Sequence, residues 1–179
     1  MSRLTGVLEA ARERGVDPEH IALVARPRGA PEAELRVLTA GELADAADER
    51  APAQVEAGAA PGHIHPLVVE PDLDAVLDLL ALWRLGATPA PLNPRLTEGE
   101  QARAREALCG RPGDGAQVVL WTSGTSGEPR GVVHGFGGLA AHVDAVVDRL
   151  ALEPATDIWA ATLSPAHIGG FMILFRALL

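Results

Sequence analysis

The sequence contains no lysine, and its 15 basic residues are all arginine. Acidic residues outnumber them at 24, which gives a formal net charge of −9. A chain with this charge is repelled by the phosphate backbone of nucleic acids and by anionic membrane surfaces. We therefore expect neither nucleic acid nor membrane among its partners.

Cysteine and long apolar runs are also scarce. Cys109 is the single cysteine, which excludes a disulfide within the chain and fits a reducing compartment. No apolar run reaches the roughly 20 residues that a transmembrane helix requires. The first residues lack the basic and then apolar pattern of a secretory signal. These observations predict a cytoplasmic protein, and its 179 residues fit one domain with a real core. The oligomeric state stays open.

Signals for helices and strands alternate along the chain, which is typical of α/β folds. Strands are predicted at 21–25, 64–70, 117–122 and 157–163. Helices are predicted over 4–14, from Leu73 to the stop signal Gly86, and from Leu139 to Leu150. Two more are predicted after capping boxes: one follows Thr39-x-x-Glu42 and runs as far as Arg50, and the other follows Thr97-x-x-Glu100 and runs as far as Leu108. The expected architecture is a mostly parallel sheet with alternating helices.

One short stretch concentrates glycines and hydroxyl side chains. The apolar run 117–121 leads into Thr-Ser-Gly-Thr-Ser-Gly-Glu-Pro-Arg at 122–130, and a segment with helical periodicity follows. Successive backbone N–H groups in such a turn can point at one spot and bind an anion. Hydroxyls add donors, glycine permits close approach, and arginine can pair with phosphate oxygens. The stretch predicts a nucleotide triphosphate site made by Thr122, Ser123, Gly124, Thr125, Ser126, Gly127 and Arg130.

The spacing differs from the Walker pattern. It closely resembles the phosphate-binding signature of the adenylate-forming (AMP-binding) superfamily, which includes the acyl-CoA synthetases. Arg130 stands where that signature usually has lysine, which keeps the charge but changes the donor geometry. The resemblance implies that this loop binds the phosphates of ATP, and that the hydroxyl of Thr125 or of a neighbour contacts Mg²⁺.

Two further segments carry the same resemblance. Residues 81–97 are similar to the family's helix-to-strand segment, written here with Pro-Leu-Asn-Pro-Arg-Leu, and we expect Asn93 and Arg95 to cap a turn there rather than to touch substrate. Residues 161–171 are similar to the segment in which Pro-x-x-His precedes a glycine-containing helix. In the family that histidine lines the acyl pocket and the pantetheine tunnel, which makes His167 the candidate catalytic residue.

The resemblance also implies a reaction. Family members join a carboxylic acid to the α-phosphate of ATP, and a thiol, usually that of coenzyme A, then displaces AMP. ATP, Mg²⁺ and coenzyme A as co-substrate are therefore expected. The family's catalytic lysine, which lies near the end of a small C-terminal domain, cannot be in this chain. We accordingly expect residues 1–179 to be an incomplete N-terminal AMP-binding domain that does not complete the reaction alone.

The identity of the acid is less constrained. Two features resemble o-succinylbenzoate–CoA ligases of menaquinone biosynthesis. They are the run from His167 to Arg176 and the short sequence separation between Thr97 and Trp121. Other fatty or aryl acid–CoA ligases share most of these features. A nonenzymatic nucleotide-binding module that evolved from the same fold is a further alternative.

Overall fold

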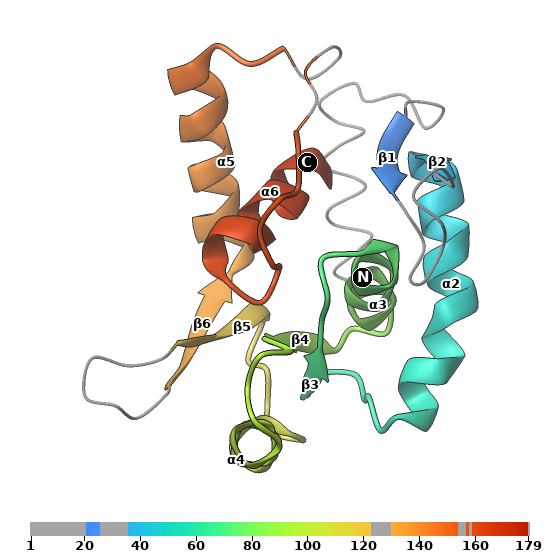
Figure 1. Ribbon diagram of the computed structural model, residues 1–179, viewed down its shortest axis with the longest axis vertical. Coiled ribbons are helices and arrows are strands. Elements are labelled where there is room, and N and C mark those ends of the chain that lie inside the picture. The colour runs from blue at the N-terminus through green and yellow to red at the C-terminus, as the bar shows by residue number, and fades with distance from the viewer. Residues whose placement is uncertain (1–20, 26–35, 123–129, 154–156, 158, 179) are drawn as a thin grey trace.

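The computed structural model describes residues 21–25, 36–122, 130–153, 157 and 159–178 (Figure 1). Its strands are β1 (Ile21–Ala25), β2 (Arg36–Thr39), β3 (Ile64–Val68), β4 (Thr88–Leu92), β5 (Ala116–Thr122) and β6 (Arg130–Gly135). Its helices are α2 (Ala40–Glu56), α3 (Leu73–Arg84), α4 (Glu98–Leu108), α5 (Phe136–Leu150) and α6 (Ile168–Leu178). The α/β class is confirmed. The helix predicted over 4–14 lies outside the described residues.

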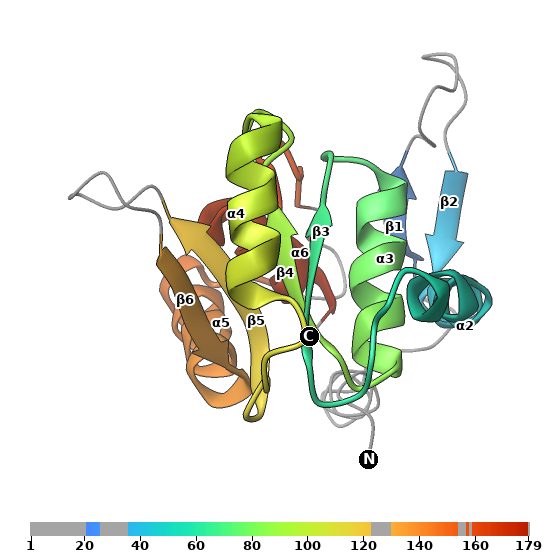
Figure 2. The same ribbon diagram turned by 90° about the horizontal axis from the view of Figure 1, so that it is seen from below.

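The strands form three hydrogen-bonded pairs within the described residues. β3 and β4 are parallel, with Ile64 opposite Thr88, whereas β1–β2 and β5–β6 are antiparallel. β4 and β5 begin beside each other, because the Thr88 hydroxyl donates to the Ala116 carbonyl at 3.1 Å. The arrows of β3, β4 and β5 point the same way in Figure 2. Their carboxyl ends therefore lie at one edge of the structure.

Strand β5 is buried on both of its faces. Side chains alternate along a strand, and Val118 and Leu120 belong to a core cluster with residues of α3, α5 and α6. Val119 and Trp121 face the opposite way, into a second cluster with residues of β3, β4 and α4. Strands β3, β4 and β5 thus form a middle layer between α4 on one side and α3, α5 and α6 on the other (Figure 1).

Trp83 connects three elements of the larger cluster. Its side chain is 1% exposed, and its Nε1–H donates to the Gln117 carbonyl of β5 at 2.8 Å. Its ring meets those of Phe171 and Phe175 edge-on, at centroid distances of 6.0 and 6.1 Å. Such edge-to-face contacts are a favoured arrangement of aromatic rings. Helix α3 is therefore fixed to both β5 and α6 through one side chain.

Within the described residues the predicted helix signals are confirmed, and the largest boundary error is at the end of α2. Both capping boxes form, with Thr39 and Thr97 each accepting from the backbone of the glutamate three residues later. Gly86, which follows α3, has a φ of +74°, a value that favours glycine. Helix α2, however, continues to Glu56 rather than ending near Arg50, and it passes through Pro52.

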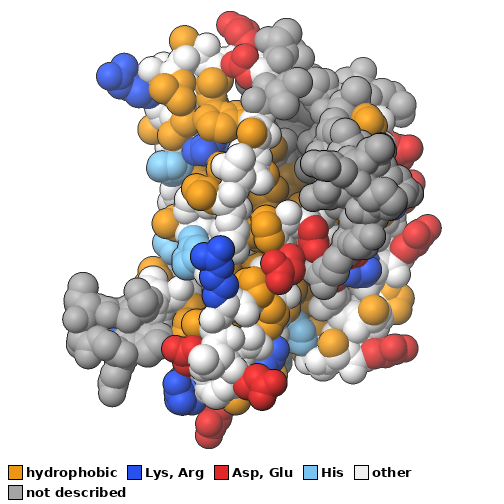
Figure 3. Space-filling model, in the orientation of Figure 1, with side chains coloured by type: hydrophobic (Ala, Val, Ile, Leu, Met, Phe, Trp, Pro, Cys, Tyr) orange, Lys and Arg blue, Asp and Glu red, His pale blue; other side chains and the backbone are white. Residues whose placement is uncertain are grey.

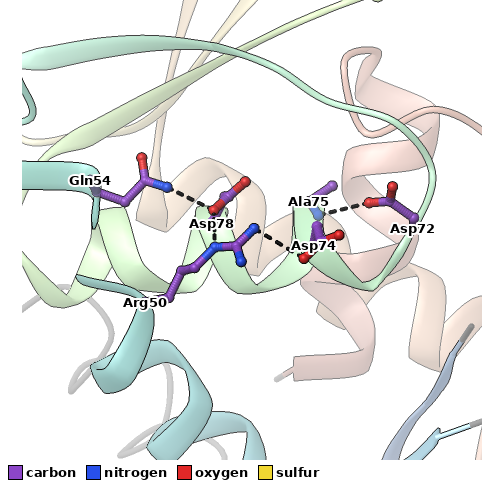
Figure 4. Close-up of polar contacts among 6 residues, drawn as sticks. All are labelled: Arg50, Gln54, Asp72, Asp74, Ala75 and Asp78. Atoms are coloured by element: carbon purple, nitrogen blue, oxygen red, sulfur yellow. Dashed lines mark hydrogen bonds and ion pairs between the residues drawn. The ribbon is translucent and has the colours of Figure 1, made fainter. Parts of the chain in front are cut away.

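Contacts with α3 explain why α2 continues. Arg50 Nε donates to Asp78 at 2.7 Å and Arg50 Nη2 to Asp74 at 3.0 Å (Figure 4). One turn later, Gln54 Nε2 donates to Asp78 at 2.7 Å. Half-exposed ion pairs contribute little stability by themselves. These contacts instead hold the last turns of α2 along α3, an effect of tertiary structure that local sequence signals do not contain.

The strand predicted over 157–163 is wrong. The described residues of this segment have no strand conformation, and those from Ala160 to Leu163 are exposed. Their hydrogen bonds are local: the Asp157 N–H donates to the Glu153 carbonyl, and the Thr162 N–H to the Ala160 carbonyl. A strand needs a neighbouring strand to pair its backbone groups, and this segment has none in the described structure.

The segment after the glycine-rich loop also differs from expectation. The helix expected directly after the loop is separated from it by β6, and this helix, α5, starts at Phe136. Val132 and Val133 are β-branched, which suits a strand, and they pair with Leu120 and Val119 of β5. The loop therefore closes an antiparallel pair and does not lead directly into a helix N-terminus.

No helix within the described ranges is long and apolar enough to cross a bilayer. Figure 3 shows hydrophobic side chains gathered on the surface formed by α5 and α6. The exposed apolar side chains in these elements and the adjoining segment include Leu150 at 58%, Leu163 at 54% and Ile168 at 46%. This side of the molecule is thus incompletely covered by the described residues.

Replacement of Trp83 with phenylalanine tests the role of this side chain. W83F removes the hydrogen bond to Gln117 and leaves a small cavity, so we expect the free energy of unfolding to fall by about 2–3 kcal/mol in urea denaturation. Val55→Ala is the control, because Val55 is 52% exposed on α2. An equal loss in both variants would contradict a special role for Trp83.

Candidate functional site

The ends of the predicted phosphate loop lie side by side. Thr122 at the end of β5 pairs with Arg130 at the start of β6, and the Thr122 hydroxyl donates to the Arg130 carbonyl at 3.2 Å. Both residues are exposed. The other predicted loop residues, including the Mg²⁺ candidate Thr125, lie outside the described residues; they are Ser123, Gly124, Thr125, Ser126 and Gly127. The structure thus positions the two ends of the loop at the carboxyl end of β5.

The second candidate, His167, lies immediately before α6. The Phe171 N–H donates to the His167 carbonyl at 2.8 Å, which starts the helix, and the His167 N–H donates to the Ser164 carbonyl at 3.1 Å. The Ser164 hydroxyl accepts from the Ala166 N–H at 3.3 Å. The backbone of His167 is therefore held at both its N–H and its carbonyl, while the residue itself is exposed.

Asn93 joins His167 in this site. Asn93 follows β4 directly, and its side-chain Nδ2 lies 2.8 Å from Nε2 of His167. Its Oδ1 accepts from the Arg95 N–H at 2.9 Å. The expected turn-capping role is thus present, and a contact with the candidate catalytic histidine accompanies it. Sequence reasoning missed this contact; a polar residue directly after a strand end was the available signal.

Close backbone packing fixes the loop that carries His167. A Cβ atom built on Gly170 would overlap the Ser164 carbonyl oxygen and lie 2.6 Å from that of Leu163. Only glycine permits this approach. At Gly169 the nearest atom to such a Cβ would be Leu163 Cδ1, at an ordinary 3.4 Å. Of the two adjacent glycines, Gly170 is the one that the loop requires.

The two parts of the site share an edge of the sheet but not a direct contact. Asn93 and His167 lie at the carboxyl end of β4, and Thr122 and Arg130 at the end of β5. No hydrogen bond or ion pair joins the two groups among the described residues. In open α/β structures, ligands bind outside the carboxyl ends of the strands. The edge could therefore accommodate one extended ligand, with its anionic part at the loop and another part near His167.

Arg176 is a further cation on α6. Its guanidinium lies 4.5 Å from the centre of the Trp159 ring, and its Nη1 is 3.5 Å from His142 Nε2. Its buried Nε has no hydrogen-bond partner within the described structure. Burial lowers the pKa of Arg176 from its ordinary value. No carboxylate of the described residues pairs with this guanidinium, so an anion that reached it would meet an available donor.

Burial perturbs one histidine away from this edge. His65 in β3 is 7% exposed, and loss of solvent lowers its pKa, an effect that the charge of Asp78 partly opposes. A neutral His65 therefore fits the core. No group of three or more metal-binding side chains gathers anywhere in the described ranges.

The second half of the chain matches a known sequence family. Residues 100–179 match the model of the AMP-binding enzymes. The matched segment contains β5, the glycine-rich loop, β6, α5 and α6, and hence the candidate site residues 122–127, Arg130 and His167. A search of curated proteins found no significant match.

Solved structures of adenylate-forming enzymes share the fold. The chain superposes on o-succinylbenzoate CoA synthetase (MenE) from Bacillus subtilis in complex with the acyl-adenylate OSB-AMP, with a TM-score of 0.76 and 20% identity, covering 99% of this chain and 53% of that one. A fatty acid AMP ligase from Legionella pneumophila gives 0.73 and 16%, covering 98% and 38%. A nonribosomal peptide synthetase bound to α-methyl-L-serine-AMP gives 0.74 and 21%, covering 99% and 23%.

These superpositions cover nearly the whole of this chain. At about 20% identity they show the fold alone, and they include enzymes whose names describe different substrates. The chain spans about half the length of the Bacillus synthetase. The expected resemblance to adenylate-forming enzymes is confirmed.

Alanine substitutions at the two adjacent glycines test how the AMP-binding segment positions His167. G170A forces the added methyl group against two carbonyls, so we expect unfolding stability to fall by about 1–3 kcal/mol in urea denaturation. G169A has room for the methyl group and lies within a helix, where alanine is favoured. It should be neutral or slightly stabilising. Equal losses in the two variants would contradict the packing described for this loop.

Proposed function

We propose that this chain belongs to an ATP-dependent acid–thiol ligase that forms an acyl-adenylate, and that residues 1–179 correspond to the first part of its large domain. The observation that carries the proposal is the Thr-Ser-Gly-Thr-Ser-Gly-x-Pro-Arg loop between β5 and β6, inside a segment that matches AMP-binding enzymes. Solved relatives with the same fold are described as complexes with ATP and magnesium, with AMP and with an acyl-adenylate.

In this proposal the loop holds the β- and γ-phosphates of ATP. Backbone N–H groups and hydroxyls of 122–127 supply donors, and Arg130 supplies a positive charge. Thr125 is the proposed hydroxyl ligand of Mg²⁺, which offsets the phosphate charge. Positioning and electrostatic stabilisation then carry most of the catalysis.

The proposed chemistry has two steps. An oxygen of the substrate carboxylate attacks the α-phosphorus of ATP, and pyrophosphate leaves with the electrons of the broken P–O bond. The sulfur of a thiol, proposed to be that of coenzyme A, then attacks the acyl carbonyl, loses its proton, and expels AMP. His167 is proposed to line the pocket of the acyl group, at the edge where Asn93 also lies.

For the acid, we propose o-succinylbenzoate. Several solved structures with the same fold are o-succinylbenzoate CoA synthetases. This acid carries two carboxylates, so one remains charged while the other is activated. Arg176, nine residues after His167 and without a carboxylate partner in the described structure, offers a cation for the second carboxylate. A fatty or aryl acid with a single carboxylate would make no use of this charge.

A nonenzymatic nucleotide-binding module is the second candidate function. The observation that favours it is Arg130 at the position where the loop signature usually has lysine, since arginine differs from lysine in donor geometry. The two functions are distinguished by acid-dependent release of pyrophosphate from ATP, measured on the full-length native protein because residues 1–179 alone are not expected to complete the reaction. Release that requires o-succinylbenzoate supports the ligase, whereas nucleotide binding without release supports the module.

Substitution of Arg130 tests the phosphate site under either function. R130A removes a charge-assisted contact worth about 1.5–3 kcal/mol, so calorimetry should show Mg·ATP binding weakened by about 10- to 100-fold. R130K keeps the charge and should bind within a few-fold of the original protein. R149A removes an exposed arginine of α5 and is the control for net charge.

The proposed site would be contradicted in either of two ways. One is wild-type protein that shows no saturable binding of Mg·ATP. The other is an equal effect of R130A and R149A, which would mean that ATP responds to overall charge and not to the loop.

A further inference from the structure

Asn93 and His167 belong to segments that are far apart in the sequence. Their side chains nevertheless meet at 2.8 Å, where the end of β4 approaches the start of α6. Asn93 is also the only asparagine of the chain. The contact raises the question of which atom donates the hydrogen.

The second contact of Asn93 answers this question. The Arg95 N–H lies 2.9 Å from Oδ1 of Asn93. A backbone N–H can only donate, so the amide atom that faces it must be the oxygen. The other end of the amide, which faces His167, is then the NH₂ group, and this group can also only donate. Nε2 of His167 is therefore the acceptor.

We infer that Asn93 is a positioning residue that holds His167 in the neutral form protonated at Nδ1. A neutral imidazole carries one hydrogen, so a ring that accepts at Nε2 bears its hydrogen at Nδ1. Histidine free in water prefers the opposite neutral form, with the hydrogen at Nε2. The contact with Asn93 thus reverses the intrinsic preference of the ring.

This assignment limits what His167 can do. While the bond to Asn93 is intact, the ring offers one donor, Nδ1–H, and no available lone pair. No described residue accepts a hydrogen bond from Nδ1, and His167 is exposed. Under the proposed function, on which this consequence rests, His167 donates to an oxygen of the acyl group or its adenylate. It does not take the proton of the thiol.

Nitrogen NMR of the ring tests the assignment directly. The complete protein is labelled with ¹⁵N-histidine, and long-range ¹H–¹⁵N correlations are recorded at a pH where the ring is neutral. The signal of His167 is identified by its loss in H167Q. We expect Nδ1 to have the shift of a protonated nitrogen and Nε2 that of an unprotonated one. A predominant Nε2–H form in the wild-type protein would overturn the inference, whether or not any variant folds.

Substitution of Asn93 with aspartate should change which ring nitrogen of His167 carries the hydrogen. In N93D one carboxylate oxygen can still accept from the Arg95 N–H, while the other presents an acceptor to Nε2. The hydrogen of the neutral ring should therefore move to Nε2. Persistence of the Nδ1–H form in folded N93D would contradict control by residue 93.

A matched control separates this effect from general disturbance of the turn. Gln101 Nε2 donates to the Leu96 carbonyl at 3.0 Å, which supports the same turn without touching His167. Q101A should keep the wild-type ring form, and a reversal in Q101A would overturn the specific role of Asn93. All spectra are recorded without nucleotide or acid. Failure of the protein to bind Mg·ATP would thus count against the proposed function and leave the ring assignment standing.

Discussion

The hydrogen bond from Trp83 to the Gln117 carbonyl connects the core of this fold to the edge that carries the candidate site. Gln117 lies in β5, which ends at the phosphate loop, and the same indole packs against Phe171 and Phe175 of α6, which follows His167. Helix α3 is buried on most of its surface, so Trp83 has little freedom to move. One side chain therefore fixes the relative positions of the strand and the helix from which both parts of the candidate site begin.

The site itself is built from residues at the ends of these elements. Asn93 directly follows β4, Thr122 ends β5, and His167 precedes α6. Each is exposed or half-buried, while the elements behind them are packed in the core. The packed elements thus provide stability, while the polar side chains at their ends can face a ligand without being buried. The requirement for glycine at position 170 shows how closely the His167 loop is packed on α6.

Local signals predicted much of this fold, and tertiary contacts account for the errors. The capping residues Thr39 and Thr97 and the stop signal Gly86 act over a few residues, and the structure confirms them. The unrecognised β6 pairs with β5, whereas the segment 157–163 has no partner strand in the described structure, and local sequence does not encode which segment finds a partner. The glycine-rich loop could be singled out from the sequence because its residues are contiguous, whereas the contact between Asn93 and His167 depends on the folding of distant segments.

The central claim is that Mg·ATP binds at the loop between β5 and β6. The most direct measurement is a titration of ¹⁵N-labelled protein with Mg·ATP, followed by amide NMR with residue assignments. The account predicts saturable shift changes concentrated at residues 122–131, with α2 on the far side of α3 unaffected. Shift changes confined to other parts of the chain, or no saturable change at all, would contradict it.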